Sequence, residues 1–280
     1  MSKFTRVVII LIALSIMTFA GVQLGSYFYD RMEDSAVNDE LSALANSPIT
    51  AEDEAAMSNY GTDDESGDDD DEDVLYQRED PDMGSKLSNY TRKLFGKAAP
   101  GQMPTSGNQT KKTLQKAQTR RINFAALKKR NKQIVAWINI PNTGIDYAVV
   151  KGTNNTQYLT MNAVRKRSSG GSIFLDSAAK ADFNNSDSIV YGHQMKDKSM
   201  FGSLNRYRNS NYKKKHQYIY IYTPSATRKY KVSSTFGTTS TTLQPDRGKT
   251  QSLTLVTCNG KSAHYAVRAQ LVSSKKPGAK

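Results

Sequence analysis

The sequence has little sulfur and little histidine: its 280 residues include one cysteine, Cys258, and three histidines. A single cysteine excludes an internal disulfide. No His, Cys and Asp residues cluster with the spacing of a metal site, so we expect neither a metal nor another cofactor. The lone thiol has three interpretations: a buried packing residue, a disulfide to another chain, or a catalytic group.

Several nucleotide-binding and nucleic-acid-binding patterns are also missing. The chain has no GxGxxG segment, P-loop or internal repeat, and no RNP, helix-turn-helix or zinc-finger pattern. Together with the export signal described next, these absences argue against nucleic acid as a partner.

One long apolar run is present near the N-terminus. Residues 7–23 (VVIILIALSIMTFAGVQ) carry no charge, and Lys3 and Arg6 precede them. The run reaches the lower limit of the roughly 17 to 25 residues that cross a bilayer as a helix. Basic residues before it and acidic residues after it favour an N-terminus inside the cell. We therefore predict a single-pass anchor over residues 1–30 in the cell membrane, with the rest of the chain extracellular; a cleaved signal peptide is the alternative.

Charge is distributed very unevenly along the chain. Residues 1–100 hold 8 basic and 20 acidic side chains (net −12), whereas residues 101–280 hold 31 basic and 6 acidic ones (net +25). Residues 51–76 alone contain twelve acidic residues and no basic one. Such a segment repels itself and buries little apolar surface, so we predict a disordered acidic and polar linker over residues 31–110. The basic domain suits anionic partners such as wall polymers or lipid head groups.

The remaining residues, 111–275, read as one mostly β domain followed by a basic tail, 276–280. Residues 112–133 have helix-forming composition and predict one or two short helices. The pattern then changes to period two, in short runs separated by Pro, Gly, Asn and Asp turns, which is typical of a barrel or a sandwich. The eight runs are IVAWINI, DYAVVKG, GGSIFLD, DSIVYGH, YIYIYT, RKYKVSSTF, SLTLVTC and HYAVRAQLV.

Two of these runs end in residues that can carry chemistry. His193 closes the run DSIVYGH, and Cys258 closes SLTLVTC. A nearby histidine favours the thiolate form of a cysteine and can later protonate a leaving group. Two strand ends on one barrel edge could bring the pair together, although spacing alone also permits a buried cysteine and an isolated surface histidine. His216 follows three lysines, and we expect it to be exposed and inert.

The chain resembles the sortases, cysteine transpeptidases of the Gram-positive cell surface. The resemblance covers about residues 120–272 and is carried by the segments IVAWINIPNTGIDYAVV, GGSIFLD, SIVYGHQMKDKSMFGSL, YIYIYTP and LTLVTC. The sequence around the histidine, which includes Met195, Met200 and Phe201, is similar to that of class B sortases. The resemblance implies an eight-stranded sortase-type β-barrel in which Cys258 forms a thioester with the threonine carbonyl of a C-terminal sorting signal. It also implies that His193 protonates the departing amine and deprotonates the incoming one.

The family's third catalytic residue is an arginine at or near the start of the last strand, and this sequence departs from that pattern. If the loop after Cys258 runs to Val267, Arg268 opens the strand and takes the family role, which is the alternative we favour. If the strand begins at His264, Arg268 lies roughly 13 Å further along it at about 3.3 Å per residue. His264 or Tyr265 then falls where the arginine belongs, and the oxyanion partner stays open. His264 is a candidate for substrate contact. Thr257, which precedes the cysteine, is another through its hydroxyl or the neighbouring backbone, and it is equally a plain strand threonine.

The resemblance implies a membrane-anchored enzyme that recognises sorting signals of the LPXTG or NPQTN kind. The acceptor amine would come from a peptidoglycan precursor or from a pilin. A sortase-like surface protein that binds signals without turnover is the alternative, because the sequence leaves two registers open for the arginine. Wall transpeptidases of the L,D type are disfavoured, since their compact His-Ser-Gly-Cys arrangement is absent.

Overall fold

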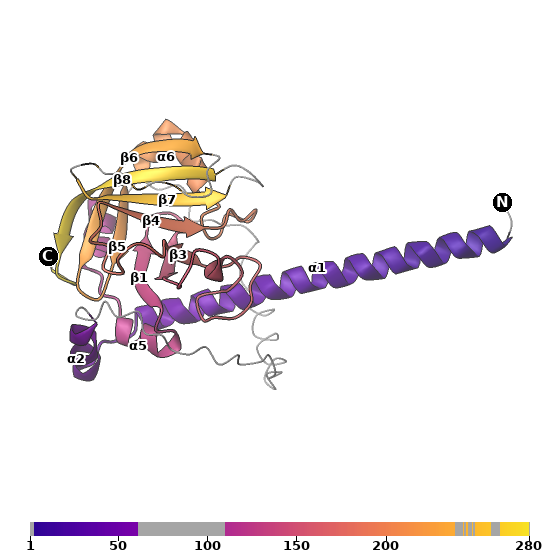
Figure 1. Ribbon diagram of the computed structural model, residues 1–280, viewed down its shortest axis with the longest axis horizontal. Helices are drawn as coiled ribbons and strands as arrows, with labels where there is room; N and C mark the ends of the chain where they lie inside the picture. Colours follow the sequence, from indigo (N-terminus) through magenta and orange to yellow (C-terminus); the bar gives the residue numbers. More distant parts are fainter. Residues whose placement is uncertain are drawn as a thin grey trace.

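The computed structural model describes residues 3–60, 110–238, 243, 245, 248, 250–258 and 264–279. Eight strands close a barrel in the order β1-β2-β3-β4-β7-β8-β6-β5 (Figure 1). Their bounds are β1 Ile134–Asn139, β2 Asp146–Val150, β3 Ile173–Leu175, β4 Asp187–Gly192, β5 Tyr218–Tyr222, β6 Thr227–Thr238, β7 Ser252–Cys258 and β8 His264–Lys275. Each strand lies within one of the eight alternating runs or overlaps most of it, so the predicted eight-stranded barrel is confirmed.

Two neighbouring pairs in the barrel are parallel, β2 with β3 and β4 with β7, and the other pairs are antiparallel. Parallel neighbours need a crossover connection. Between β4 and β7 the chain forms η2 (Leu204–Arg208), α6 (Ser210–Lys215), β5 and β6. Strands β4 and β7 therefore end at the same edge of the barrel although 65 residues of sequence separate those ends.

The barrel has an inner core and an outer one, as period-two alternation requires. On β5, Ile219 and Ile221 pack inside the barrel, while Tyr220 and Tyr222 pack outside it, against the helices. The outer core is covered by α4 (Lys111–Thr119) and α5 (Phe124–Arg130), so of the one or two short helices expected in this region the structure has two. The single tryptophan, Trp137, is buried in this outer layer.

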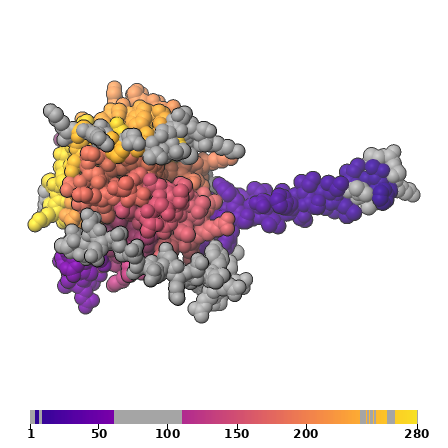
Figure 2. Space-filling model, viewed as in Figure 1, coloured from indigo at the N-terminus to yellow at the C-terminus, as the bar shows by residue number. Residues whose placement is uncertain are grey.

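Helix α1 (Lys3–Ala45) is a long rod that projects from the barrel, and its first half is exposed (Figure 2). It is long and apolar enough to cross a membrane, by length and composition. The last turns of α1 are instead packed on the domain: Val37, Leu41 and Ala45 are buried in the outer core at a spacing of four residues. The spacing puts these side chains on one face of the helix.

The linker predicted from residue 31 therefore begins later. Residues 31–45 continue α1 onto the domain, and α2 (Ala51–Asn59) follows with a capping box between Thr50 and Asp53. The side-chain amide of Asn123 (Nδ2) donates to the Asp53 carboxylate at 3.1 Å, and this bond connects α2 to the start of α5. The correction has a simple physical reason: this segment carries enough apolar side chains at helical spacing to cover part of the outer core. Most of the acidic block lies in residues 61–109, outside the described residues.

His216 also differs from expectation, since it is fully buried rather than exposed. Its ring lies 4.2 Å from the Tyr212 ring, and its Nδ1 is 3.4 Å from the carbonyl oxygen of Pro141. The lysines before it, 213–215, close the short helix α6, after which the chain turns inward. Burial lowers the pKa of His216 below its ordinary value.

Candidate active site

The two residues predicted to carry chemistry follow neighbouring positions of β4 and β7. In the parallel register of these strands Gly192 pairs with Thr257, and the next residues along the chain are His193 and Cys258. Neighbouring strands lie about 4.8 Å apart, and residues in register have the same orientation relative to the sheet. The topology thus brings the backbones of His193 and Cys258 together at one barrel edge, on the side from which α1 projects (Figure 1).

The residue before each of them faces the barrel interior. Val190 and Leu255 lie in the inner core, and Gly192 and Thr257 have the same parity as these residues. Thr257 is fully buried, so its side chain belongs to the barrel interior. A substrate contact of Thr257 through its backbone stays a prediction.

Gly192 has no room for a side chain. A Cβ at this position would lie 2.5 Å from Cδ1 of Ile173 and 2.8 Å from Cδ2 of Phe201, far inside normal contact distances. The glycine before the histidine therefore lets Phe201 pack against the end of β4. This contact explains physically why a glycine precedes His193 in the motif.

His193 is held by the loop that follows it. The amide of Phe201 donates to the carbonyl oxygen of His193 at 3.0 Å, and Gln194 and Met200 form a β-bridge that closes residues 194–200 into a compact turn. Met195 and Met200 are buried in the inner core. The His193 side chain is half-buried, and burial lowers its pKa. A neutral imidazole, which can accept a proton, is therefore favoured near neutral pH.

The last strand begins at His264, so the expectation that Arg268 opens it is wrong. In the antiparallel β7–β8 register Cys258 pairs with His264, and Thr254 pairs with Arg268. Residues 259–263 lie outside the described residues. Strand β8 pairs with β7 from His264 to Gln270, along the whole length of β7. His264 is thus directly across from the cysteine position, and Arg268 lies four residues further along.

Arg268 instead takes part in a polar cluster with Asp187 and Thr254. Its Nε donates to Oγ1 of Thr254 at 3.1 Å, and its Nη2 lies 3.6 Å from the Asp187 carboxylate. The Thr254 hydroxyl is 3.0 Å from both oxygens of that carboxylate. The Asp187 side chain has no exposed surface, and the guanidinium also lies 5.2 Å from the centre of the Phe236 ring.

Sequence reasoning missed Asp187. The available signal was its place at the start of the run DSIVYGH, an acidic residue opening a strand that is otherwise buried. A buried carboxylate needs a partner, and Arg268 and Thr254 provide it. Among the residues that the structure describes, no group of three His, Cys, Asp or Glu side chains could hold a metal ion.

This barrel is similar to the sortases, both in sequence and in structure. Residues 138–273 match the family model described as the sortase domain. Sortase B of Staphylococcus aureus (strain NCTC 8325 / PS 47) is 36% identical over 99 residues, which cover 35% of this chain and 41% of that protein. Sortase B of Listeria monocytogenes serovar 1/2a (strain ATCC BAA-679 / EGD-e) is 38% identical over 86 residues, 31% of this chain and 35% of that protein. The matched segments thus span well under half of these curated relatives.

Two solved structures share the fold. A sortase B crystal structure described as a complex with triglycine has a TM-score of 0.51 and 26% identity, and the match covers 54% of this chain and 86% of that one. A Staphylococcus aureus sortase B-substrate complex has a TM-score of 0.50 and 26% identity, with coverage of 54% and 85%.

Proposed function

We propose that the protein is a membrane-anchored cysteine transpeptidase of the sortase family, because residues 138–273 match the sortase domain model and because the similar proteins described above are named sortase B. It cleaves a C-terminal sorting signal and transfers the new carboxyl end to an amine of peptidoglycan or of a pilin. The observation that carries the proposal is the parallel register of β4 and β7, in which the residues following Gly192 and Thr257 are His193 and Cys258.

The proposed chemistry has two acyl-transfer steps. In the first, the Cys258 sulfur attacks the threonine carbonyl of the signal while His193 takes the thiol proton and passes it to the departing amine. The peptide bond breaks and a thioester forms. In the second step an incoming amine attacks the thioester, His193 takes a proton from it, and the thiol is restored. Bond energy stays in the thioester, so the exchange of one amide for another needs no ATP.

The low pKa of His193 supports its role as the proton carrier. Burial favours the neutral ring in the resting protein, and a neutral ring can accept the thiol proton. The imidazolium formed in this way then donates to the leaving amine, so one side chain serves both directions of proton transfer.

Two residues compete for the third role, which is to stabilise the oxyanion. Arg268 carries the permanent charge that suits this task, but its contacts with Thr254 and Asp187 hold it four residues from the level of Cys258. The register supports His264, which pairs with Cys258 across the β7–β8 hairpin. Directly opposed residues of antiparallel strands have Cβ atoms about 5 Å apart. We therefore assign the oxyanion contact to His264 and a structural role to Arg268.

The position of the site relative to α1 supports a substrate held at the cell membrane. The apolar run of residues 7–23 ends eight residues before Arg31, which contacts the domain, so Arg31 lies roughly 12 Å further along the helix at 1.5 Å per residue. The edge where β4 and β7 end is on the side of the barrel from which α1 projects (Figure 1). A sorting signal of the LPXTG or NPQTN kind that adjoins the membrane segment of its own protein would lie at about the same distance from the membrane as the active site.

The acceptor is proposed from the chemistry and from one similar structure. A sortase B structure is described as a complex with triglycine, and a peptide with a free amino end is a suitable nucleophile for a thioester. We propose a peptidoglycan amine of this type, with a pilin lysine as the other acceptor of the same chemistry.

The test is a transpeptidation assay with the full chain in detergent micelles. A library of peptides with LPXTG-like and NPQTN-like sequences is incubated with triglycine, and products are identified by mass spectrometry. Cleavage with ligation to triglycine that disappears in Cys258→Ala and His193→Ala is expected. Binding of signal peptides with no cleavage of any library member would instead favour a sortase-like binding protein without turnover, an alternative suggested by the displaced Arg268.

A further inference from the structure

Helix α1 contacts the same loop that closes on His193. Its exposed first half carries the apolar run, and from residue 31 onward its side chains enter the domain. Arg31 and Asp34 are three residues apart and therefore lie on one helix face. This face is turned toward the loop of residues 194–200 and toward residues 168–170, two segments that border the β4 end of the barrel.

Arg31 binds two side chains of the histidine loop. Its Nη2 donates to the Asp197 carboxylate and to the hydroxyl oxygen of Ser199, the latter at 2.8 Å. Only 17% of the Arg31 side chain is exposed. Burial by itself would raise the pKa of Asp197, but hydrogen bonds from Ser199 and from Arg31 outweigh it, and the net pKa is lowered. The carboxylate is therefore charged and paired near neutral pH.

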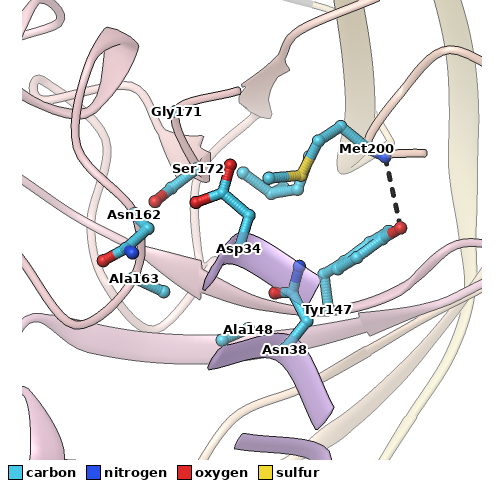
Figure 3. Close-up of a pocket in the computed structure, with 10 residues that line it drawn as sticks. Asp34, Asn38, Tyr147, Ala148, Asn162, Ala163, Gly171, Ser172 and Met200 are labelled. Atoms are coloured by element: carbon cyan, nitrogen blue, oxygen red, sulfur yellow. Dashed lines mark hydrogen bonds between the residues drawn. The ribbon is translucent and has the colours of Figure 1, made fainter. Parts of the chain in front are cut away.

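The loop itself has little freedom to absorb a displacement. Lys198 and Met200 have positive φ angles of 68° and 49°, an uncommon conformation for residues other than glycine. The amide of Met200 donates to the hydroxyl oxygen of Tyr147 at 3.2 Å, as the dashed line in Figure 3 shows. Since the next amide, that of Phe201, donates to the carbonyl oxygen of His193, a shift of residues 197–199 is transmitted to the histidine.

A second contact fixes the height of α1 against the domain. Asp34 is buried and accepts a hydrogen bond from the Ser168 hydroxyl at 2.7 Å. Its carboxylate points from α1 toward Gly171 and Ser172 and toward the Met200 side chain (Figure 3). At Gly170, a Cβ would lie 3.2 Å from the Asp34 carboxylate and 3.3 Å from Nη1 of Arg31, so the helix lies tightly on this segment. Because these contacts fix the position of α1 along its axis, Arg31 holds the 194–200 loop in one position relative to the barrel.

We propose that Arg31 is a positioning residue for His193. At the extracellular end of the membrane helix, Arg31 holds the 194–200 loop through its contacts with Asp197 and Ser199. The anchor helix thereby helps to orient the catalytic histidine. This inference rests on the proposed function. It implies that losing the Arg31 contacts with this loop lowers the acyl-transfer rate while the rest of α1 stays packed on the barrel.

The test uses the full chain in detergent micelles and compares Arg31→Ala, Arg31→Lys and Asp197→Ala. The matched control is Arg130→Ala, which removes another ion pair between the domain and α1, Arg130 with Glu40 at 2.7 Å, away from the histidine loop. Arg31→Ala should lower kcat for peptide cleavage about tenfold with KM changed less than twofold, because small misplacements of a catalytic group mainly affect the chemical step.

Three comparisons make the result decisive. Arg31→Lys should recover part of the rate, Arg31→Ala combined with Asp197→Ala should be no worse than the worse single variant, and Arg130→Ala should match the wild type. Equal kcat in Arg31→Ala and Arg130→Ala would overturn the proposal. A decrease in kcat that is proportional, across the variants, to the decrease in melting temperature would also overturn it.

A readout that needs no sorting signal separates this inference from the proposed function. The rate of Cys258 alkylation by iodoacetamide reports activation of the thiol by its neighbours. Arg31→Ala should slow it about tenfold relative to Arg130→Ala. If the wild type cleaves no peptide but this difference is found, the proposed function fails and the positioning role stands; if no difference is found, the positioning role fails.

Discussion

Replacing Arg268 by methionine separates a structural role of this residue from a catalytic one. Methionine keeps most of the length of the side chain and its contact with Phe236, but it removes the charge that faces Asp187. The Asp187 carboxylate has no exposed surface, and the Thr254 hydroxyl, which is 3.0 Å from both of its oxygens, still donates to it after the substitution.

The expected loss of stability follows from this burial. Removing one partner of a buried ion pair costs about 3 to 5 kcal/mol, because the remaining charge stays in the interior and loses a compensating contact. The 3.6 Å separation and the 22% exposure of the Arg268 side chain put this pair at the lower end, about 3 kcal/mol. For a domain of this size each kcal/mol lowers the melting temperature by about 2 to 4 °C, so a decrease of about 6 to 12 °C is expected.

The assay measures thermal unfolding and kcat on the same samples. Replacing Asp187 by asparagine together with Arg268→Met removes both charges and should recover most of the lost melting temperature. Peptide cleavage by the double variant, measured well below its melting temperature, should lie within about fivefold of the wild type. A melting temperature unchanged by Arg268→Met would refute the structural argument. A stable double variant with a rate reduced a hundredfold would show instead that Arg268 acts on the substrate.

Three further predictions concern residues near the site and in the core. His264→Ala should lower kcat about 100-fold, as the loss of one oxyanion donor does, and a loss below threefold would contradict the assignment that its pairing with Cys258 supports. Gly192→Ala should lower the free energy of unfolding by about 1 to 3 kcal/mol in a urea titration, because the added methyl meets Phe201; unchanged stability would show that the end of β4 adapts. Burial lowers the pKa of His216, so the unfolded chain binds a proton more readily, and the stability present above the unfolded pKa of about 6.5 is lost as pH falls below it. The drop in melting temperature from pH 7.5 to pH 5 should therefore be smaller in His216→Phe, and an equal drop would exclude a contribution of this ring.

The strands were predictable because each of them alternates. On β5 the isoleucines and tyrosines separate cleanly into the inner and outer cores, and the same period marks the other runs. The order of the strands around the barrel was not visible, because nothing local to DSIVYGH and SLTLVTC states that β4 and β7 pair in parallel. The approach of His193 and Cys258 depends on that non-local pairing.

The misses have physical causes of their own. His216 follows three lysines, and charge nearby in sequence says little about a ring that turns back into the core. The helical end of α1 could be predicted in part, since Val37, Leu41 and Ala45 repeat every four residues. The acidic residues around them, however, favoured the prediction of a linker. For Arg268, the length of the loop after Cys258 decided between two registers, and loop length depends on pairing energies that one sequence does not reveal.

The most direct measurement of the central claim is the intact mass of the full chain after incubation with a cleavable sorting-signal peptide and no added amine. The account predicts an adduct equal to the peptide fragment that ends in threonine, located on Cys258 by fragmentation, absent in Cys258→Ala and released by hydroxylamine or triglycine. Cleaved peptide without any adduct on Cys258, even with rapid quenching, would contradict it.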